Sequence, residues 1–311
     1  MRVSVIMPAW KRRFLRRAIE SVLSQEFRDF ELVVVDDASP EGLGGVVRGF
    51  ADPRLVYRRN EANIGGGDLA AAWNCAMGHA RGDLSVLASD DDEYDPAFLG
   101  EMVRLADGKP GVDVFHCRVA YRDAEARESG ASELRAGWES AVEFMYNRCV
   151  RRMRQCAPEF PFRTEALRAI GGFVPFPRAW HSDDATWMSL ARRGGVAYTP
   201  RPLLRWRSSP ENISSQFEDA AEKIEASELF REWAHAYLAG LEPQSESERE
   251  MLARAHSGVG RGTDHLSLWV LRHAGLKGAA RAVAGLRGGV SAKCGFLVRM
   301  AAAAARRVVG A

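Results

Sequence analysis

The sequence has few features that would cross-link the chain or anchor it in a membrane. Its five cysteines are odd in number and form no Cys-x-x-Cys pair, so we expect reduced thiols, a cytoplasmic protein and no paired-thiolate zinc site. Every window of about 18 residues contains a charged side chain, which excludes a predicted transmembrane helix. Gly (29) and Pro (13) occur at ordinary levels, which excludes a collagen-like or disordered chain.

An excess of charge of one sign is also missing. The chain holds 43 Lys and Arg against 41 Asp and Glu, a net charge of +2, so it has no general basic field for nucleic acid. Its 311 residues, of which 46% are hydrophobic, are enough to bury a full-sized core. We therefore expect a globular protein of the size of an enzyme, with no nucleic-acid partner.

The near-neutral total hides an uneven distribution of charge. Residues 261–311 hold nine Lys and Arg against one acid, Asp264, whereas residues 1–260 hold 34 basic and 40 acidic residues. Large apolar side chains lie between the cations of this basic tail, a composition that suits helices lying on an anionic membrane surface. A helical lid or a homodimer contact would have the same composition. The tail thus predicts peripheral contact with the inner face of the cell membrane, or one of these packing roles.

The first third of the chain alternates short β-branched runs with helical patterns, which is typical of a parallel sheet with crossover helices. Acidic residues follow two of the predicted strands, and a glycine-rich loop with Asp68 as a helix cap follows another. The predicted strands are 3–7, 32–35, 55–57 and 84–87, and the first helix is 14–23. The carboxyl ends of parallel strands are where α/β proteins bind ligands.

The rest of the chain predicts a second half and a helical extension. We expect a strand over 112–119, an insertion or mobile loop over 121–137, helices near 138–151 and 181–193, and helices over 215–238 and 246–255. The fold class is therefore α/β, a mostly parallel central sheet flanked by helices with a helical C-terminal extension. The predicted division is a catalytic domain over 1–214, with halves 1–110 and 111–214, and a helical region over 215–311.

Three successive aspartates follow the strand that ends at Leu87. Asp90, Asp91 and Asp92 would repel one another unless a cation or hydrogen-bond donors neutralise them. Carboxylate oxygens suit Mg²⁺ or Mn²⁺, and such ions keep positions open for substrate phosphates. The alternative is a solvated acidic turn at the start of the next helix, which Asp95-Pro96 predicts to begin there.

The order and spacing of several motifs resemble those of the family 2 glycosyltransferases, inverting enzymes with the GT-A fold and a Rossmann-like sheet. The resemblance extends over about residues 2–210. It rests on Val3–Trp10, Phe30–Ser39, Asn63-x-Gly65, the helix through Asn74, Ser89–Pro96, and Phe162–Phe173 followed by Ser182-Asp183-Asp184.

The resemblance implies a nucleotide-sugar donor, weighted towards a UDP-sugar, and a role for each matching residue. Asp92 would be the principal ligand of a Mn²⁺ or Mg²⁺ ion, with Asp91 on the metal or the donor ribose, and Asp37 on the edge of the base. Either Trp10 or the more usual Tyr can stack on uracil. The donor-binding residues are then Pro8, Ala9, Trp10, Asp36, Asp37, Asn63, Asp90 and Asp91.

The second acidic pair implies the base of the reaction. Inverting transfer needs a base that takes the proton of the acceptor hydroxyl, and the resemblance favours Asp184, with Asp183 as the second candidate. Both aspartates could instead only cap the helix that begins beside them. His181 is expected to have a structural role.

Three positions depart from the family pattern. Ser89 stands at the first position of the DXD motif, and Lys11 stands where Asn is common, either near the phosphates or on a solvated helix face. The sequence Arg205-Trp206-Arg207 lacks the histidine that often follows, so no third protein ligand for the metal is implied. Arg205 or Arg207 would then neutralise the diphosphate, or lie on the surface.

Two other functions use similar features. A nucleotidyltransferase would carry a glycine-rich loop after the first strand, but this loop, residues 8–12, has no glycine. A catalytically silent nucleotide-sugar binder would not need the intact Asp92 and Asp184. The favoured function is sugar transfer to a carbohydrate or lipid-linked acceptor in surface polysaccharide or glycolipid assembly.

Overall fold

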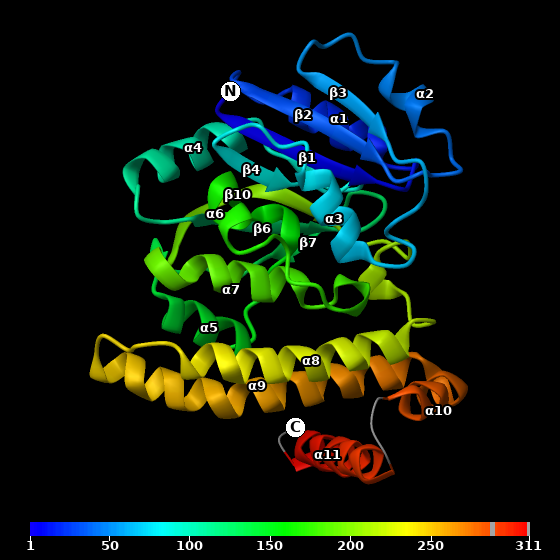
Figure 1. The fold of residues 1–311 in the computed structure, drawn as a ribbon, viewed down its shortest axis with the longest axis vertical. Helices are drawn as coiled ribbons and strands as arrows, with labels where there is room; N and C mark the ends of the chain where they lie inside the picture. Colours follow the sequence, from blue (N-terminus) through cyan, green and yellow to red (C-terminus); the bar gives the residue numbers. More distant parts are fainter. Residues whose placement is uncertain (287–289, 310–311) are drawn as a thin grey trace.

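The computed structural model describes residues 1–286 and 290–309. A ten-stranded sheet lies between helices, and two long neighbouring helices, α8 (Ala220–Ala239) and α9 (Glu246–His273), form a further layer below it (Figure 1). The two helices that follow α9 lie at the end of the molecule farthest from the N-terminus (Figure 1). The predicted α/β sheet with a helical C-terminal extension is confirmed.

The strands alternate with helices through the first third of the chain and less regularly after it. The strands are β1 (Val3–Ala9), β2 (Phe30–Asp36), β3 (Leu55–Arg59), β4 (Leu84–Leu87), β5 (Glu93–Tyr94), β6 (Val114–Arg122), β7 (Glu128–Ala131), β8 (Trp138–Glu139), β9 (Pro161–Arg163) and β10 (Val196–Arg207). The other α-helices are α1 (Leu15–Leu23), α2 (Leu43–Val47), α3 (Leu69–Met77), α4 (Phe98–Gly108), α5 (Ala141–Cys149), α6 (Thr164–Ala169), α7 (Ser182–Gly194), α10 (Gly275–Gly285) and α11 (Val290–Val309). Short 3₁₀ helices are η1 (Ala157–Glu159), η2 (Pro177–Ala179) and η3 (Ile213–Ser215).

The strand order places the ends of β1, β2 and β4 side by side. The order is β3-β2-β1-β4-β9-β6-β10-β5, with β7 paired to β6 and β8 paired to β10. Strands β1 to β4 are parallel, β6 and β10 are parallel, and β9 runs antiparallel between β4 and β6. The carboxyl ends of the first parallel strands therefore meet at one edge, where α/β proteins bind ligands.

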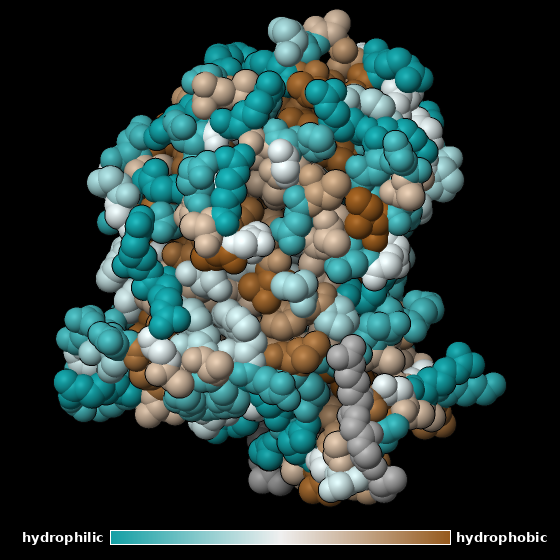
Figure 2. All heavy atoms as spheres, viewed as in Figure 1, coloured by the Kyte–Doolittle hydropathy of each residue, from teal (hydrophilic) through white to brown (hydrophobic). Residues whose placement is uncertain are grey.

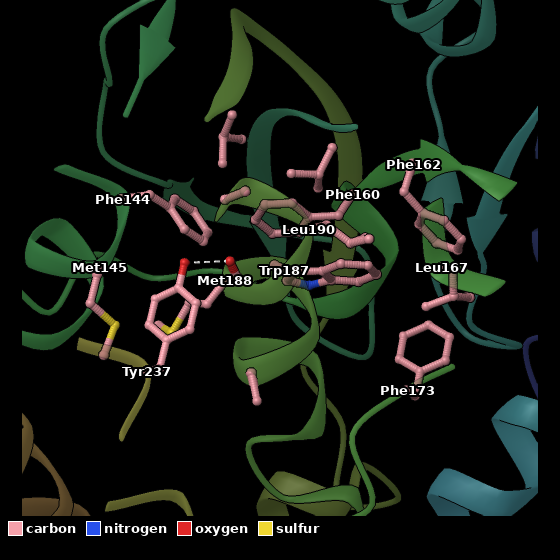
Figure 3. Packing of buried hydrophobic residues seen from close by; sticks show 14 of the residues in the cluster. Phe144, Met145, Phe160, Phe162, Leu167, Phe173, Trp187, Met188, Leu190 and Tyr237 are labelled. Carbon is pink, nitrogen blue, oxygen red and sulfur yellow. Dashed lines mark hydrogen bonds between the residues drawn. The ribbon is translucent and has the colours of Figure 1, made fainter. Parts of the chain in front are cut away.

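Side chains of β1 alternate between two cores, as a buried strand requires. Val5 and Met7 belong to the apolar cluster that includes side chains of α1, α2 and α4, whereas Ile6 belongs to the cluster that includes side chains of α3 and α5 to α9. In the second core, Trp187 of α7 is fully buried and stacks on Phe160 at 5.2 Å between ring centroids. Tyr237 of α8 donates a hydrogen bond to the backbone oxygen of Met188 (Figure 3). These contacts anchor α7 between the sheet and the C-terminal helices.

Several local predictions are corrected by the structure. The segment 121–137 is not a loop throughout, because β7 forms a hairpin with β6. The helix after the aspartates begins at Phe98 rather than beside Asp95-Pro96, because Glu93 and Tyr94 first pair with β10. The cap predicted for α3 is confirmed, since Asp68 accepts a hydrogen bond from Ala71 N at 2.9 Å.

The C-terminal region does not divide at residue 261. Helix α9 continues through that position to His273, and the apolar cluster around α7 includes side chains from α8 and α9. The predicted domain boundary between residues 214 and 215 stays a prediction, although packing crosses it.

Ion pairs neutralise part of the basic tail. Arg299 pairs with Glu228 and with Asp264, the latter at 3.3 Å, and Arg306 lies 3.9 Å from Asp264. Arg287 and the side chain of Arg307, two of the tail's cations, lie outside the described residues. No helix in the described part of the chain is both long enough and apolar enough to cross a bilayer.

Candidate active site

Asp37 fixes the glycine-rich loop at the end of β2. Its Oδ1 accepts hydrogen bonds from Asn60 Nδ2 at 2.6 Å and Ile64 N at 3.1 Å, and its Oδ2 accepts one from Gly65 N at 2.7 Å. A Cβ on Gly65 would lie 3.0 Å from Asp37 Oδ2, so this close approach favours glycine. The exposed Asn63 closes the same turn by accepting a hydrogen bond from Gly66 N. The structure thus brings these predicted donor-binding residues to one edge of the sheet.

Asp36 lies beneath this loop and is fully buried. Its carboxylate accepts hydrogen bonds from Ser39 N at 2.8 Å and Tyr57 Oη at 2.5 Å, and it pairs with Arg59. These partners join the end of β2 to β3. We therefore assign Asp36 a structural role rather than the ligand contact that the sequence predicts.

The end of β1 leaves one aromatic ring exposed. Pro8 is half-buried and Ala9 is buried, whereas Trp10 is 40% exposed. Ser39 Oγ donates a hydrogen bond to the backbone oxygen of Trp10 at 2.6 Å, which holds the residue in place while its ring meets solvent. An exposed ring at this edge is free to stack on a planar base.

Asp90 joins the loop after β4 to the loop after β1. Its Oδ2 accepts hydrogen bonds from the backbone N–H groups of Trp10 and Lys11, each at 2.8 Å. The ammonium of Lys11 contacts Asp91 Oδ2 and lies 3.4 Å from Asp90 Oδ1. Burial opposes the charge of Lys11, but the two carboxylates outweigh it and raise the pKa of the ammonium.

Asp92 lies deeper, with 2% of its surface exposed. Its Oδ1 accepts a hydrogen bond from Arg207 N at 2.8 Å, while the guanidinium of Arg207 pairs with Glu93 and donates to the backbone oxygen of Asp91. Burial, together with the charge of Asp91, raises the pKa of Asp92 well above its usual value. Arg207 therefore holds the acidic loop from within, and Arg205 pairs with Asp95 at 3.1 Å.

The chemistry of this loop fits a hard divalent cation. Three carboxylates, Asp90, Asp91 and Asp92, lie on one loop, and the ammonium of Lys11 contacts two of them. Burial, with repulsion from Asp91 as a smaller cause, raises the pKa values of Asp90 and Asp92. Within residues 1–286 and 290–309, no group of three or more His, Cys, Asp and Glu side chains is arranged to hold a metal. Mg²⁺ is usually bound through one or two carboxylates together with substrate phosphates, so two of these aspartates would be enough to hold it.

Asp184, at the start of α7, has polar partners at both of its carboxylate oxygens. Arg148 of α5 donates to both of its oxygens, at 2.7 and 2.9 Å, Gln155 donates to Oδ1 at 2.7 Å, and His181 Nδ1 lies 2.9 Å from Oδ2. Burial opposes ionisation, but Arg148 and His181 outweigh it, and the pKa of Asp184 is held below its usual value. A carboxylate that is paired so tightly is a weak proton acceptor.

Asp183 has the opposite environment. Its side chain is partly exposed, and burial, followed by repulsion from Asp184, raises its pKa to about 7. A carboxylate with a pKa near neutrality is suited to general-base catalysis. The directions of these two pKa shifts distinguish the two candidates for the base.

Two buried groups, Glu159 and Cys156, have raised pKa values to which the candidate site aspartates contribute. Glu159 of η1 is 2% exposed, and burial, with a smaller contribution from Asp183, raises its pKa to about 8. Burial raises the pKa of Cys156 as well, and the charges of Glu159 and Asp92 add to that shift. The charges of Asp92 and Asp183 thus each influence one of these buried groups, although 91 positions separate the two aspartates in the sequence.

Strained backbone lies beside two candidate site residues, Asp37 and Asp183. Ala38, directly after Asp37, has φ of 59°, and Arg178, Ala179 and His181, just before Asp183, have φ between 50° and 69°. Such left-handed conformations cost on the order of 1–3 kcal/mol each at residues other than glycine and tend to occur at functional sites. The neighbouring contacts must hold these two loops in place against that cost.

Sequence reasoning missed several of these residues. Arg148, Gln155 and Glu159 belong to no recognisable motif, and their importance follows from their contacts with Asp184, His116 and Cys156. Glu159 follows a proline and precedes an apolar run, which would suggest a turn and not a buried acid.

Comparison with known proteins identifies the family. The model of the family described as "Glycosyl transferase family 2" matches residues 4–171, more than half of the chain. The chain is 39% identical over 97 residues to "Putative colanic acid biosynthesis glycosyl transferase WcaA" of Escherichia coli, covering 30% of this chain and 34% of that protein. It is 38% identical over 91 residues to "Succinoglycan biosynthesis protein ExoO" of Rhizobium meliloti, covering 29% of this chain and 25% of that protein. The matched segments thus span between a quarter and about a third of these relatives.

Solved structures share the fold over nearly the whole chain. TarS 1–349 of S. aureus, in complex with UDP-GlcNAc, is 16% identical with a TM-score of 0.55, and the match covers 91% of this chain and 89% of that one. The mannosyltransferase PcManGT of Pyrobaculum calidifontis, in complex with GDP-Man and Mn²⁺, is 20% identical with a TM-score of 0.58, covering 97% and 79%. With the family match extending over β1 to α6 and this sheet architecture, the chain belongs to glycosyl transferase family 2 and has the GT-A fold.

Proposed function

We propose that the protein is an inverting glycosyltransferase, which moves a sugar from a nucleoside-diphosphate sugar to an acceptor hydroxyl. One observation carries the proposal: Asp90 of the loop after β4 accepts hydrogen bonds from the backbone of Trp10 and Lys11 after β1, which brings the acidic loop and an exposed aromatic ring together at the carboxyl ends of parallel strands in a family 2 chain. Donor-binding groups are thereby gathered at one edge of the sheet, where α/β proteins bind ligands.

On the donor side, each group has a distinct task. Trp10 stacks on the base, the loop held by Asp37 contacts the base and ribose, and Asp91 and Asp92 hold the ion through their remaining oxygens. Mn²⁺ or Mg²⁺, when bound, neutralises the charge that develops on the departing diphosphate. Asp90 keeps this loop against the backbone of Trp10 and Lys11, which fixes the carboxylates before the donor arrives.

On the acceptor side, we propose Asp183 as the general base. It takes the proton of the acceptor hydroxyl as that oxygen attacks the anomeric carbon and the bond from that carbon to the diphosphate oxygen breaks. Its pKa of about 7 leaves a large fraction ionised at neutral pH, and its partly exposed position gives an acceptor access. Asp184, with Arg148, holds the first turn of α7 in position.

The donor and acceptor are proposed by class. TarS binds UDP-GlcNAc and PcManGT binds GDP-Man, so the same fold accepts either base, and the resemblance of the motifs favours UDP. The names of the two relatives refer to colanic acid and succinoglycan biosynthesis. We therefore propose transfer to a carbohydrate or lipid-linked acceptor in surface polysaccharide or glycolipid assembly.

The C-terminal helices offer a contact with an anionic membrane at its inner face. Leu276 is 93% exposed and Val298 is 68% exposed, and the sequence has no acid after Asp264. Figure 2 shows brown, apolar atoms near the end of the molecule where α10 and α11 lie. Exposed apolar side chains among cations are what an anionic lipid surface attracts, and a homodimer is the alternative outcome for this surface.

A direct test measures the turnover of nucleotide-sugar donors. Purified protein is incubated with radiolabelled UDP-sugars and GDP-sugars and Mn²⁺, and hydrolysis or transfer is measured for the wild type and for Asp92→Ala. We expect slow hydrolysis by the wild type that falls at least 10-fold in the variant. Undiminished turnover in Asp92→Ala would refute the donor site. Binding of nucleotide sugar without turnover under any condition would favour the catalytically silent binder.

A further inference from the structure

Lys11 places a positive charge inside the carboxylate cluster. Its ammonium contacts Asp91 and lies 3.4 Å from Asp90 Oδ1, and only 21% of its side chain is exposed. A lysine on a solvated helix face would extend into water, because its charge is strongly hydrated. Lys11 instead turns inward to the two carboxylates.

The acidic loop does not need this ammonium to keep its shape. Asp90 Oδ2 already accepts two backbone hydrogen bonds, which any residue at position 11 would supply. At its other end, the loop is held by Arg207, through Asp92, Glu93 and the backbone oxygen of Asp91. The side chain of Lys11 therefore adds a charge to a loop that is already fixed.

The ammonium also has an unused donor. A lysine ammonium carries three N–H groups, and the contacts with Asp90 and Asp91 account for two of them. The residue stands just after β1, at the edge of the sheet where α/β proteins place the phosphates of a nucleotide. A phosphate oxygen that approaches this edge would meet the third N–H and an ion pair that is partly open to solvent.

We propose that Lys11 is a resident cation of the donor site, which donates its free N–H to the diphosphate of the nucleotide sugar. The inference rests on the proposed function. Because the ammonium offsets part of the negative charge of Asp90 and Asp91 and also faces the diphosphate, nucleotide binding depends less on a divalent ion. Because the ammonium and the ion both bind Asp91, they compete for it.

The competition is tested with Mn²⁺ alone. Electron paramagnetic resonance measures free Mn²⁺ during titration of the wild type, Lys11→Asn and the exposed control Lys277→Met. Removing the ammonium frees Asp91, so we expect Lys11→Asn to bind Mn²⁺ about 10-fold more tightly than the wild type, with Lys277→Met unchanged. Equal affinities in all three proteins would overturn the inference, with circular dichroism showing that each is folded.

The diphosphate contact is tested with UDP by calorimetry, in EDTA and in Mn²⁺. We expect wild-type affinity in EDTA to stay within about 10-fold of that in Mn²⁺, and Lys11→Met to lose about 10–100-fold in EDTA, the usual effect of a lost charge-assisted hydrogen bond. Lys11→Arg should keep most of the EDTA affinity. Wild-type binding that requires Mn²⁺ would overturn the role of Lys11 and leave the proposed function intact. Absence of UDP and GDP binding under both conditions would overturn the proposed function itself, while the Mn²⁺ titration would still decide the competition.

Discussion

Replacing Asp183 and Asp184 separately by Asn should produce two different defects. Asp183→Asn removes a proton acceptor that has no tight ion pair, so we expect kcat to fall about 10²–10⁴-fold, the usual contribution of a general base. The melting temperature should change little, because the amide keeps the shape of the side chain. Activity of the wild type should rise with pH up to about 7, since the base must lose its proton, whose pKa is raised to about 7, and this limb should disappear in the variant.

Asp184→Asn should act mainly on stability. It leaves the guanidinium of Arg148 without its charged partner, where the wild type has two hydrogen bonds of 2.7 and 2.9 Å. Breaking a buried ion pair on one side costs about 3–5 kcal/mol, and the lower end applies because 27% of the Arg148 side chain is exposed. The melting temperature should therefore fall on the order of 10 °C.

The assay measures nucleoside diphosphate release, UDP binding and thermal unfolding on the same preparations. Asp183→Glu serves as the conservative control, and it should recover part of the activity lost in Asp183→Asn. The reasoning fails if Asp184→Asn unfolds at the wild-type temperature but is inactive while Asp183→Asn turns over normally. That result would make Asp184 the base, as the resemblance of the sequence motif implied.

Three further changes probe other parts of the molecule. Gly65→Ala puts a Cβ 3.0 Å from Asp37 Oδ2 and should weaken UDP binding about 3–10-fold, whereas in the control Gly67→Ala the nearest atom is 3.8 Å away and calorimetry should find no change. Burial raises the pKa of Glu159 from 4.5 to about 8, so the folded state loses stability as pH rises between these values, by up to about 1.4 kcal/mol per pH unit. The free energy of unfolding of Glu159→Gln, measured with denaturant, should rise relative to that of the wild type as pH increases over that range. A difference in this free energy that does not change with pH would contradict the raised pKa. Leu276→Glu should reduce co-sedimentation with anionic vesicles without changing the melting temperature, and unchanged binding would remove α10 from the proposed membrane contact.

The parallel half of the fold was readable from the sequence because local signals and packing agree there. Val3–Met7 and Leu84–Leu87 are short, largely apolar runs that follow Arg2 and Asp83, and the structure has them as central strands buried on both faces. A strand in that position can be predicted without knowing which strand pairs with it, since apolar side chains on either face meet a layer of helices.

The errors arose where pairing with a distant strand decides the outcome. Glu93 and Tyr94 directly follow the three aspartates and carry no strand pattern, but they pair with β10. The stretch 121–137 predicts a loop, but its exposed residues Glu128–Ala131 form a strand beside β6. Long-range pairing of this kind leaves no periodic pattern in a short segment.

The candidate site was predictable to the level of motifs and not to the level of individual roles. The sequence motifs single out Asp90 to Asp92 and Asp183 to Asp184, which the structure has on the loop after β4 and in the first turn of α7, but the motifs do not assign each carboxylate its neighbours. Whether an aspartate is a base or half of an ion pair depends on Arg148 of α5, 36 positions before Asp184, and no pattern near either residue indicates that pairing.

The C-terminal helices take part in this assignment. His181 contacts Asp184 through Nδ1, while its ring stacks on Phe230 of α8 at 4.4 Å and its Nε2 lies 3.3 Å from Ser227 of the same helix. Arg148 lies on α5, which packs against α9, since Gly258 of α9 leaves room for Val150 there. Two of the three side chains that hold Asp184, His181 and Arg148, are thus positioned by the α8 and α9 layer. Because burial, followed by repulsion from Asp184, raises the pKa of Asp183, a change in how that layer packs would alter the base, and the helical extension is therefore part of the catalytic unit that we propose.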